Sequence, residues 1–184
     1  MTINELIKLI EQWAIDRGLD KNGTVEGQLI KTAEEVAELI IGISKDDIEV
    51  IKDSVGDVFV TLVVGNMLSR NFDFFEFYWQ GFCAWHKDLY GRSIRPTIVI
   101  TDSEDKLKVI HYLTRQIGDM DTFREYKEHI CSGVIFGLLK VAALYDLDFV
   151  ECVESAYKEI SNRKGKVING TFWKSEDLEK WEEE

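Results

Sequence analysis

The amino-acid sequence predicts an all-α protein built as an antiparallel helix bundle. Its 184 residues include a single proline, Pro96, and long helices tolerate proline badly. Apolar side chains recur every three or four residues over most of the chain, as they do on the buried face of a helix. Apolar residues make up 45% of the chain and charged residues 30%, which is typical of globular proteins. We therefore expect one domain, residues 1–184, with a full hydrophobic core.

The apolar spacing places helices at about residues 3–18, 25–43, 47–69, 104–117, 121–145 and 148–162. The DKNG segment at 20–23 turns the chain after the first helix, and Thr24 can cap the second. The turn at 42–47 is short, so the second and third helices are expected to be antiparallel neighbours.

Two segments have less regular patterns. The stretch 71–105 is dense in aromatic residues at its start and can hold one short strand, Thr97 to Thr101. We expect it to be an insertion of irregular form. The tail after residue 162 is polar and rich in turn residues, apart from room for one last helix.

The net charge of −12 argues against a nucleic-acid polymer as partner, because phosphate backbones are held by an excess of Lys and Arg. A small anion would need a local basic cluster or a bound cation. The three cysteines form no CxxC pair, and reduced thiols in the cytoplasm are the simplest interpretation. The amphipathic N-terminus is not a signal peptide, and no apolar run suggests a membrane segment.

The second helix carries an acidic stripe. Gln28, Lys31, Glu35 and Glu38 fall on one side of it at 100° per residue. Two carboxylates three residues apart can bind one hard cation. A solvated helix face explains the same pattern, since the stripe lies opposite the apolar residues.

The third helix is apolar almost all round from Val55 onward, which indicates burial. Asp57 lies inside this pattern, with Asp53 one turn earlier on the same side. A buried carboxylate needs a partner or a shifted pKa. Gly56 would let another helix or a ligand approach closely.

Two kinds of partner for Asp57 remain open, a basic side chain or a metal ion. It can form a salt bridge with Lys31 or Arg163, or share a metal ion with Glu35 and Glu38. Several carboxylates in one site repel each other unless cations neutralise them. Mg²⁺ prefers oxygen ligands, commonly bridges to substrate phosphates and lowers the pKa of a bound water.

The densest basic cluster comprises Arg163, Lys164 and Lys166, followed by Asn169 and Gly170. The glycines around it suggest a flexible loop whose backbone amides can face an anion. Its basic residues also suit the solvated C-terminus of a helix. Contact with phosphate is the functional interpretation.

Three blocks of sequence together resemble the MazG-like superfamily of all-α nucleotide pyrophosphohydrolases, especially small members from bacteriophages and Gram-positive bacteria. They are GQLIKTAEEVAELIIGISKDD at 27–47, IKDSVGDVFVTL at 51–62 and AYKEISNRKGKVINGTFWK at 156–174. They follow the family's order and cover about 50 of the 184 residues.

The resemblance implies four metal ligands, ExxE on one helix and ExxD on the next. Glu35 and Glu38 match the first pair, and Asp57 matches the final aspartate. Ser54 stands where the family has glutamate, and Asp53 is the nearest acid. This departure leaves the fourth ligand and the number of metal ions open.

The implied reaction is cleavage of a (deoxy)nucleoside triphosphate between its α and β phosphates, giving the monophosphate and pyrophosphate. A water activated by Mg²⁺, for which Mn²⁺ can substitute, and by a glutamate would attack phosphorus. The candidate glutamates are Glu35, Glu38 and the neighbouring Glu34, while Gln28 and Lys31 can contact phosphate or base. The basic tail would meet the developing charge.

Family members are usually dimers or tetramers, so self-association is expected, in the host cytoplasm if the chain is of phage origin. Trp13, Phe172 and Trp173 are candidates to stack on the base, although Trp13 has the spacing of a core residue. Two rival functions remain. One is nucleotide binding or sensing without turnover, for which Ser54 is the reason. The other is a helical interaction module with a solvated acidic face.

Overall fold

The computed structural model describes residues 1–69, 73–76, 78, 103–123, 128–176 and 178. Over these residues the protein is helical apart from one two-stranded sheet, so the predicted all-α class is confirmed. Most of the expected insertion at 71–105, including its strand at 97–101, lies outside the described residues. Among its aromatic residues that are described, Phe74 and Tyr78 are buried and pack edge-on against Phe59.

The N-terminal helix α1 spans Ile3–Asp16 and starts with a capping box formed by Thr2 and Glu5. The predicted turn at 20–23 is wrong, because Leu19–Asn22 form a further short helix, α2. A single helical turn holds there because the Leu19 side chain is buried and its carbonyl accepts a hydrogen bond from the Gly23 N–H.

Helices α3 (Val25–Lys45) and α4 (Ile48–Ser69) confirm the predicted second and third helices. Thr24 caps α3 by accepting a hydrogen bond from the Gly27 N–H. At the other end Asp46 adopts φ 54°, and the Asp47 N–H bonds back to the Gly42 carbonyl at 3.0 Å. This Schellman turn ends α3 within two residues and sends α4 back along it.

The later helices are α6 (Ser103–Phe123), α7 (Glu128–Leu144) and α8 (Phe149–Asn162). The predicted break near residue 118 is wrong, because α6 continues through Gly118, and α7 begins at Glu128 instead of residue 121. The expected helix at 148–162 is confirmed as α8, which Asp148 caps.

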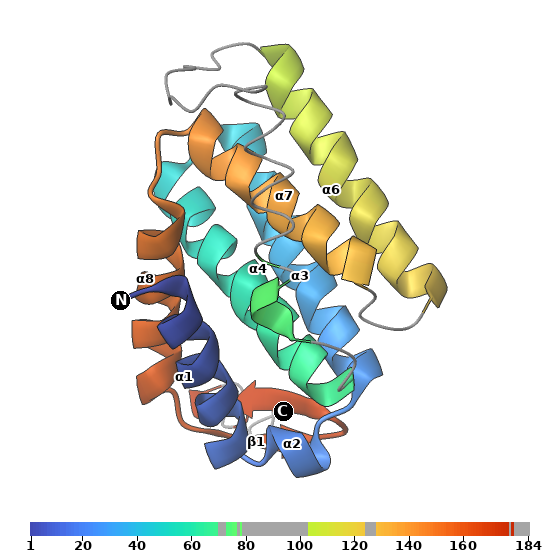
Figure 1. Cartoon of the computed structure of the whole chain (residues 1–184), viewed down its shortest axis with the longest axis vertical. Coiled ribbons are helices and arrows are strands. Elements are labelled where there is room, and N and C mark those ends of the chain that lie inside the picture. The colour runs from blue at the N-terminus through green and yellow to red at the C-terminus, as the bar shows by residue number, and fades with distance from the viewer. Residues whose placement is uncertain (70–72, 77, 79–102, 124–127, 177, 179–184) are drawn as a thin grey trace.

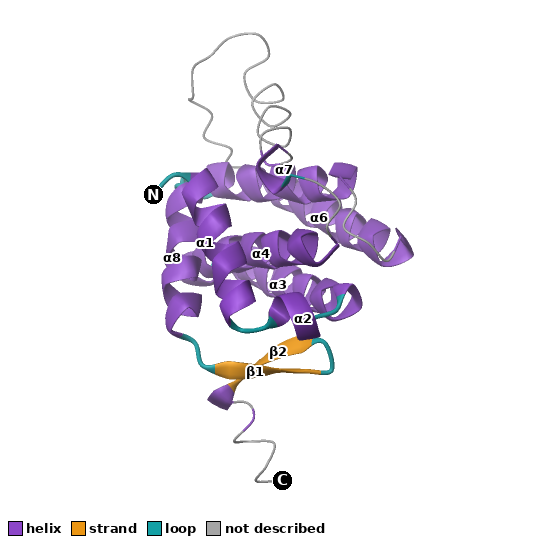
Figure 2. Cartoon of the chain, turned by 60° about the horizontal axis from the view of Figure 1, so that its bottom comes forward, coloured by secondary structure: helices purple, strands orange, loops and turns teal. Residues whose placement is uncertain are grey.

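The tail forms a β-hairpin, where a polar segment with a flexible loop was expected. Strands β1 (Gly165–Ile168) and β2 (Thr171–Lys174) pair antiparallel, with Gly165 opposite Lys174. Asn169 and Gly170 connect them with φ values of 50° and 84°, the backbone of a type I′ turn. The expected flexible loop at 165–170 is therefore wrong. Figure 2 shows the hairpin lying across one end of the bundle, beneath α2.

Helix α4 is the centre of the bundle. Figure 1 shows α1 and α8 on one side of it and α6 and α7 on the other, and α3 packs along it most extensively. Residues 54–56 and 58–66 of α4 are buried, as predicted. Gly56 serves the approach of α8, because a Cβ atom there would lie 2.5 Å from the Cys152 carbonyl oxygen. No described helix combines the length and the apolar character that a membrane span requires.

Candidate functional site

A pocket of about 250 Å³ opens between α3, α4, α8 and β2. It has an acidic end, a basic side and an apolar end. Its lining residues are Trp13, Leu19, Gln28, Lys31, Glu35, Glu38, Asp53, Asp57, Val60, Thr61, Val64, Glu159, Ile160, Arg163, Phe172 and Lys174.

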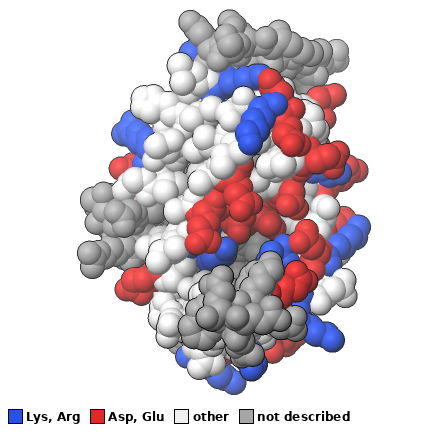
Figure 3. Space-filling model, turned by 180° about the vertical axis from the view of Figure 1, so that it is seen from behind, with Lys and Arg blue, Asp and Glu red and all other residues white. Residues whose placement is uncertain are grey.

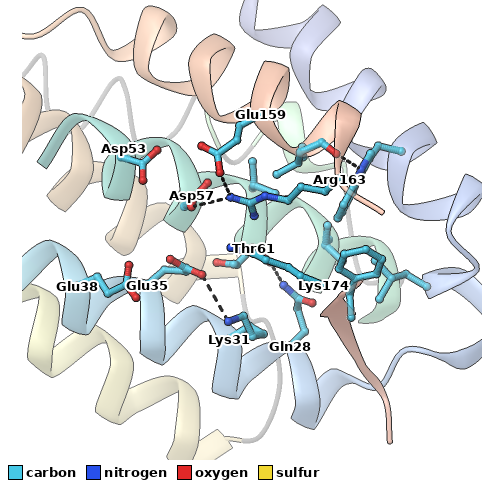
Figure 4. Close-up of a pocket in the computed structure, with 16 residues that line it drawn as sticks. Gln28, Lys31, Glu35, Glu38, Asp53, Asp57, Thr61, Glu159, Arg163 and Lys174 are labelled. Atoms are coloured by element: carbon cyan, nitrogen blue, oxygen red, sulfur yellow. Dashed lines mark hydrogen bonds and ion pairs between the residues drawn. The ribbon is translucent and has the colours of Figure 1, made fainter. Parts of the chain in front are cut away.

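The acidic end gathers carboxylates from the two helices that the sequence singled out. Glu35 and Glu38 come from α3, and Asp53 and Asp57 from α4. Figure 4 shows the two pairs facing each other across the pocket. Figure 3 shows acidic side chains gathered into one patch on the side of the molecule hidden in Figure 1. The expected antiparallel arrangement therefore brings these four acids together.

Asp57 is the deepest of these acids. Its side chain is 13% exposed, and burial, followed by the charges of Glu35 and Asp53, raises its pKa to about 7. Of the two salt-bridge partners considered, Arg163 is the one found, with its Nη2 atom 3.9 Å from Asp57 Oδ2. That separation is at the long limit of an ion pair, and it leaves the carboxylate poorly compensated.

The neighbouring acids are electrically coupled to Asp57 and to each other. Burial is the main cause that raises the pKa of Glu35, with a further contribution from Glu38. Burial also raises the pKa of Asp53, to which Glu159 and Glu38 add. The carboxylates of the two helices therefore make each other harder to ionise, as expected of a site that a cation neutralises.

Asp53, and not Ser54, faces the pocket. Ser54 is 3% exposed and does not line it, whereas Asp53 stands one helical turn before Asp57 on the same side of α4. The position that holds glutamate in the MazG-like pattern therefore points into the core here.

Lys31 lies at the border of the acidic end. Its Nζ atom pairs with Glu34 and stands 3.6 Å from Glu35 Oε1. Glu34 is 52% exposed and does not line the pocket. Of the three candidate catalytic glutamates, Glu35 and Glu38 thus reach the pocket and Glu34 lies outside it.

The candidate basic residues divide in the same way. Arg163 lines the pocket, and Lys164 lines an adjoining one that shares Arg163 and Lys174 with it. Lys166 on β1 and Asn169 in the hairpin turn are exposed and line neither pocket. The basic side therefore consists of Arg163, Lys31 and a residue that was not predicted, Lys174.

The apolar end is closed by an aromatic pair. Trp13 and Phe172 meet edge-on with ring centroids 5.5 Å apart, and the Trp13 indole N–H donates to the Ile160 carbonyl at 2.8 Å. Trp13 is thus both a core residue, as its spacing predicted, and part of the lining. Trp173 points away and is 38% exposed. The amide of Gln28 lies beside this end and donates to the Thr61 carbonyl at 3.3 Å.

The donors at the acidic end suit a hard divalent cation, because they are all carboxylate oxygens. Their positions are looser than a coordination shell: among the described residues, no three His, Cys, Asp or Glu side chains are grouped closely enough to hold a metal ion as they stand. Glu38 and Asp53 are exposed at the rim, so their side chains are the ones with room to move.

Three polar residues of the lining were not expected from the sequence: Thr61, Glu159 and Lys174. Lys174 reaches the pocket because the hairpin pairs it with Gly165, just after Arg163. The Asn169–Gly170 dipeptide between two apolar segments was the available signal for that hairpin. Glu159 lies one turn before Arg163 on α8 and forms an ion pair with it.

Comparison with known proteins gives one informative match. No protein-family model matches the chain, and no solved structure matches it significantly. Over 62 residues, or 34% of this chain, it is 50% identical to an uncharacterized 18.2 kDa protein in the rep-hol intergenic region of Haemophilus phage HP1. The match spans 38% of that relative. Its source is consistent with a phage origin for this chain, and its description names no activity.

Proposed function

We propose that this protein is a magnesium-dependent nucleoside triphosphate pyrophosphohydrolase of the MazG-like all-α type. It would convert a (deoxy)nucleoside triphosphate to the monophosphate and pyrophosphate, with Mn²⁺ able to replace Mg²⁺, in the cytoplasm of the host cell. The observation that carries the proposal is that Glu35 and Glu38 of α3 share one pocket with Asp53 and Asp57 of α4. The resemblance in sequence supplies the reaction.

The three parts of the pocket match the three parts of a cation–nucleotide complex. The carboxylates suit the cation, and Arg163, Lys174 and Lys31 suit the phosphates. The Trp13–Phe172 end offers an apolar surface to a base, with the Gln28 amide beside it as a hydrogen-bonding group. In a protein of net charge −12, an anionic ligand needs such local compensation.

The reaction needs a water to attack the α-phosphorus while the bond to the β-phosphate oxygen breaks. A divalent cation held by Glu35, Glu38, Asp53 and Asp57 would supply the positive charge that lowers the pKa of this water. Glu35 is the side chain best suited to take the water's proton, because it is 15% exposed and burial raises its pKa. Arg163 and Lys174 would stabilise the charge that gathers on the leaving pyrophosphate.

The direct test is pyrophosphate release from each of the eight common NTPs and dNTPs in the presence of Mg²⁺. We expect turnover of at least one of them, and loss of turnover in Glu38→Ala and Asp57→Ala with the fold intact. Glu26→Gln, which removes an exposed acid from the same helix outside the pocket, should retain it. Wild-type turnover in both pocket variants would show that the site is misplaced.

A nucleotide sensor without turnover is the second candidate, and Ser54 at the glutamate position favours it. It predicts that nucleotides bind with Mg²⁺ and that no pyrophosphate appears. If neither nucleotide binding nor stabilisation by Mn²⁺ or Mg²⁺ is seen, the acids are a solvated face and the protein is a helical interaction module.

Self-association as a dimer or tetramer is part of the same proposal. Ile30 and Ile41 are 60% and 49% exposed, and Ala37 between them is exposed too. Ile30 and Ile41 lie about three helical turns apart, and all three residues are on one side of α3. Light scattering after size-exclusion chromatography measures the mass, and a mass of 21.3 kDa would contradict this part.

A further inference from the structure

Arg163 lies between two carboxylates from different helices. Its guanidinium forms an ion pair with Glu159 on α8 and stands 3.9 Å from Asp57 on α4. The two carboxylates differ sharply in surroundings, because Glu159 is 52% exposed and Asp57 is 13% exposed. The arginine thus bridges a solvated acid and a buried one.

The backbone of Arg163 is anchored independently of its side chain. It is the C-terminal cap of α8, and its carbonyl accepts hydrogen bonds from Arg17 at 3.2 and 2.9 Å. Arg17 also binds the Ser161 carbonyl at 3.0 Å, and its guanidinium lies 4.9 Å from the centre of the Trp13 ring. Movement of Arg163 is therefore confined to its side chain, which lies in the wall between two pockets.

We propose that Arg163 is an exchangeable counter-ion of Asp57, and that Glu159 is the positioning residue that holds Arg163 when a divalent cation takes its place. The inference rests on the proposed function, since it assumes that a cation binds at the acidic end. In the cation-free protein Arg163 partly neutralises Asp57. When the cation binds Asp57, Glu159 keeps the guanidinium at the edge of the pocket, where the phosphates of a nucleotide would lie.

The charges around the arginine favour such an exchange. Asp57, Glu35 and Glu159 all attract it, and Lys174, a second cation in the same pocket, also attracts Glu159. A divalent cation and a guanidinium within reach of one carboxylate compete for it. Without Glu159, the arginine would have Asp57 as its nearest acid and would oppose the cation more strongly.

The test measures Mn²⁺ affinity without nucleotide, from the electron paramagnetic resonance signal of free Mn²⁺. We expect Arg163→Gln to bind Mn²⁺ about fivefold more tightly than wild type and Glu159→Gln about fivefold more weakly. In the double variant the effect of Glu159→Gln should fall below about twofold, because its partner is gone. The control is Glu154→Gln, which removes an acid with the same four-residue spacing to a cation, Lys158, elsewhere on α8. It should bind Mn²⁺ like wild type.

A second measurement separates exchange from a purely structural ion pair. With Mn²⁺ present, Arg163→Gln should bind α,β-methylene-ATP about tenfold more weakly, opposite in sign to its effect on Mn²⁺ alone. If Glu159→Gln weakens Mn²⁺ binding equally with and without Arg163, Glu159 acts only as a charge and the positioning role is overturned. If Arg163→Gln leaves Mn²⁺ affinity unchanged, the exchange is overturned while the cation site stands. Absence of Mn²⁺ binding to the wild type overturns the proposed function as well.

Discussion

Asp57→Asn replaces one oxygen of the deepest carboxylate by an NH2 group. The side chain loses its charge and keeps nearly the same shape. Burial holds the pKa of Asp57 above that of an unfolded aspartate. The folded protein therefore keeps this proton at a pH where the unfolded chain has lost it. Asp57 therefore contributes to the free energy of unfolding at pH 4, and this contribution is lost as the pH rises to 7. The asparagine does not titrate, so the variant escapes this loss.

The expected gain in the free energy of unfolding follows from the shift in the pKa of Asp57. A rise in pKa from 3.8 to about 7 corresponds to a ceiling of about 4 kcal/mol at pH 8. Relaxation of the site and loss of the 3.9 Å contact with Arg163 reduce the benefit to about 2 kcal/mol. The variant should thus be the more stable protein at pH 8 in EDTA, with an advantage that shrinks towards pH 5.

Urea denaturation between pH 5 and pH 8 measures this difference, with Asp16→Asn on the exposed side of α1 as the control. Adding Mn²⁺ at pH 8 should reverse the order. A ligand at a hundred times its Kd stabilises the folded wild type by about 2.7 kcal/mol, and the variant lacks the central donor. A variant less stable than wild type at every pH in EDTA would refute this reasoning, since the charge of Asp57 would then be fully compensated.

Three further predictions concern two residues of the pocket, Glu35 and Lys174, and the packing of α8 against Gly56. Glu35→Gln should lower pyrophosphate release at least about a hundredfold while leaving the melting temperature within a few degrees, if Glu35 takes the proton of the attacking water. Lys174→Gln should weaken binding of α,β-methylene-ATP with Mn²⁺ about tenfold, whereas Lys166→Gln on the neighbouring strand should not change it; equal losses would show that only the overall charge matters. Gly56→Ala should cost about 1–3 kcal/mol in chemical denaturation, because its new methyl group would lie 2.5 Å from the Cys152 carbonyl oxygen.

Local patterns predicted the helices that carry the acids. α3 and α4 begin and end close to the expected residues, because their caps and turn are made by neighbouring side chains and backbone. The same reasoning failed between α6 and α7, where the expected helices left a break at 118–120, which begins with Gly118. That glycine has open space around it and the helix continues through it.

Features that depend on distant parts of the chain could not be derived in this way. Periodicity shows that Asp57 is buried, but not that Arg163 rather than Lys31 approaches it. It does not place Lys174 beside α3 either, because that position follows from the pairing of β1 with β2. Residues 165–170 were expected to form a loop because glycine is flexible. The Asn-Gly pair at 169–170 is instead a strong signal for a hairpin.

The hairpin supplies one wall of the pocket beside α3. Its turn docks on the first residues of α3: the Thr24 N–H donates to the Gly170 carbonyl at 3.0 Å, and a Cβ atom on Gly27 would lie 2.9 Å from that oxygen. This contact holds Phe172 and Lys174 over the groove between α3 and α4. Without that wall, Glu35 would face water and its pKa would be raised less. The site would also attract an anion more weakly, because the charge of Lys174 would be missing. An acidic stripe alone is a solvated face. In this protein the hairpin beside it adds burial and the positive charge of Lys174, which the proposed binding of phosphates needs.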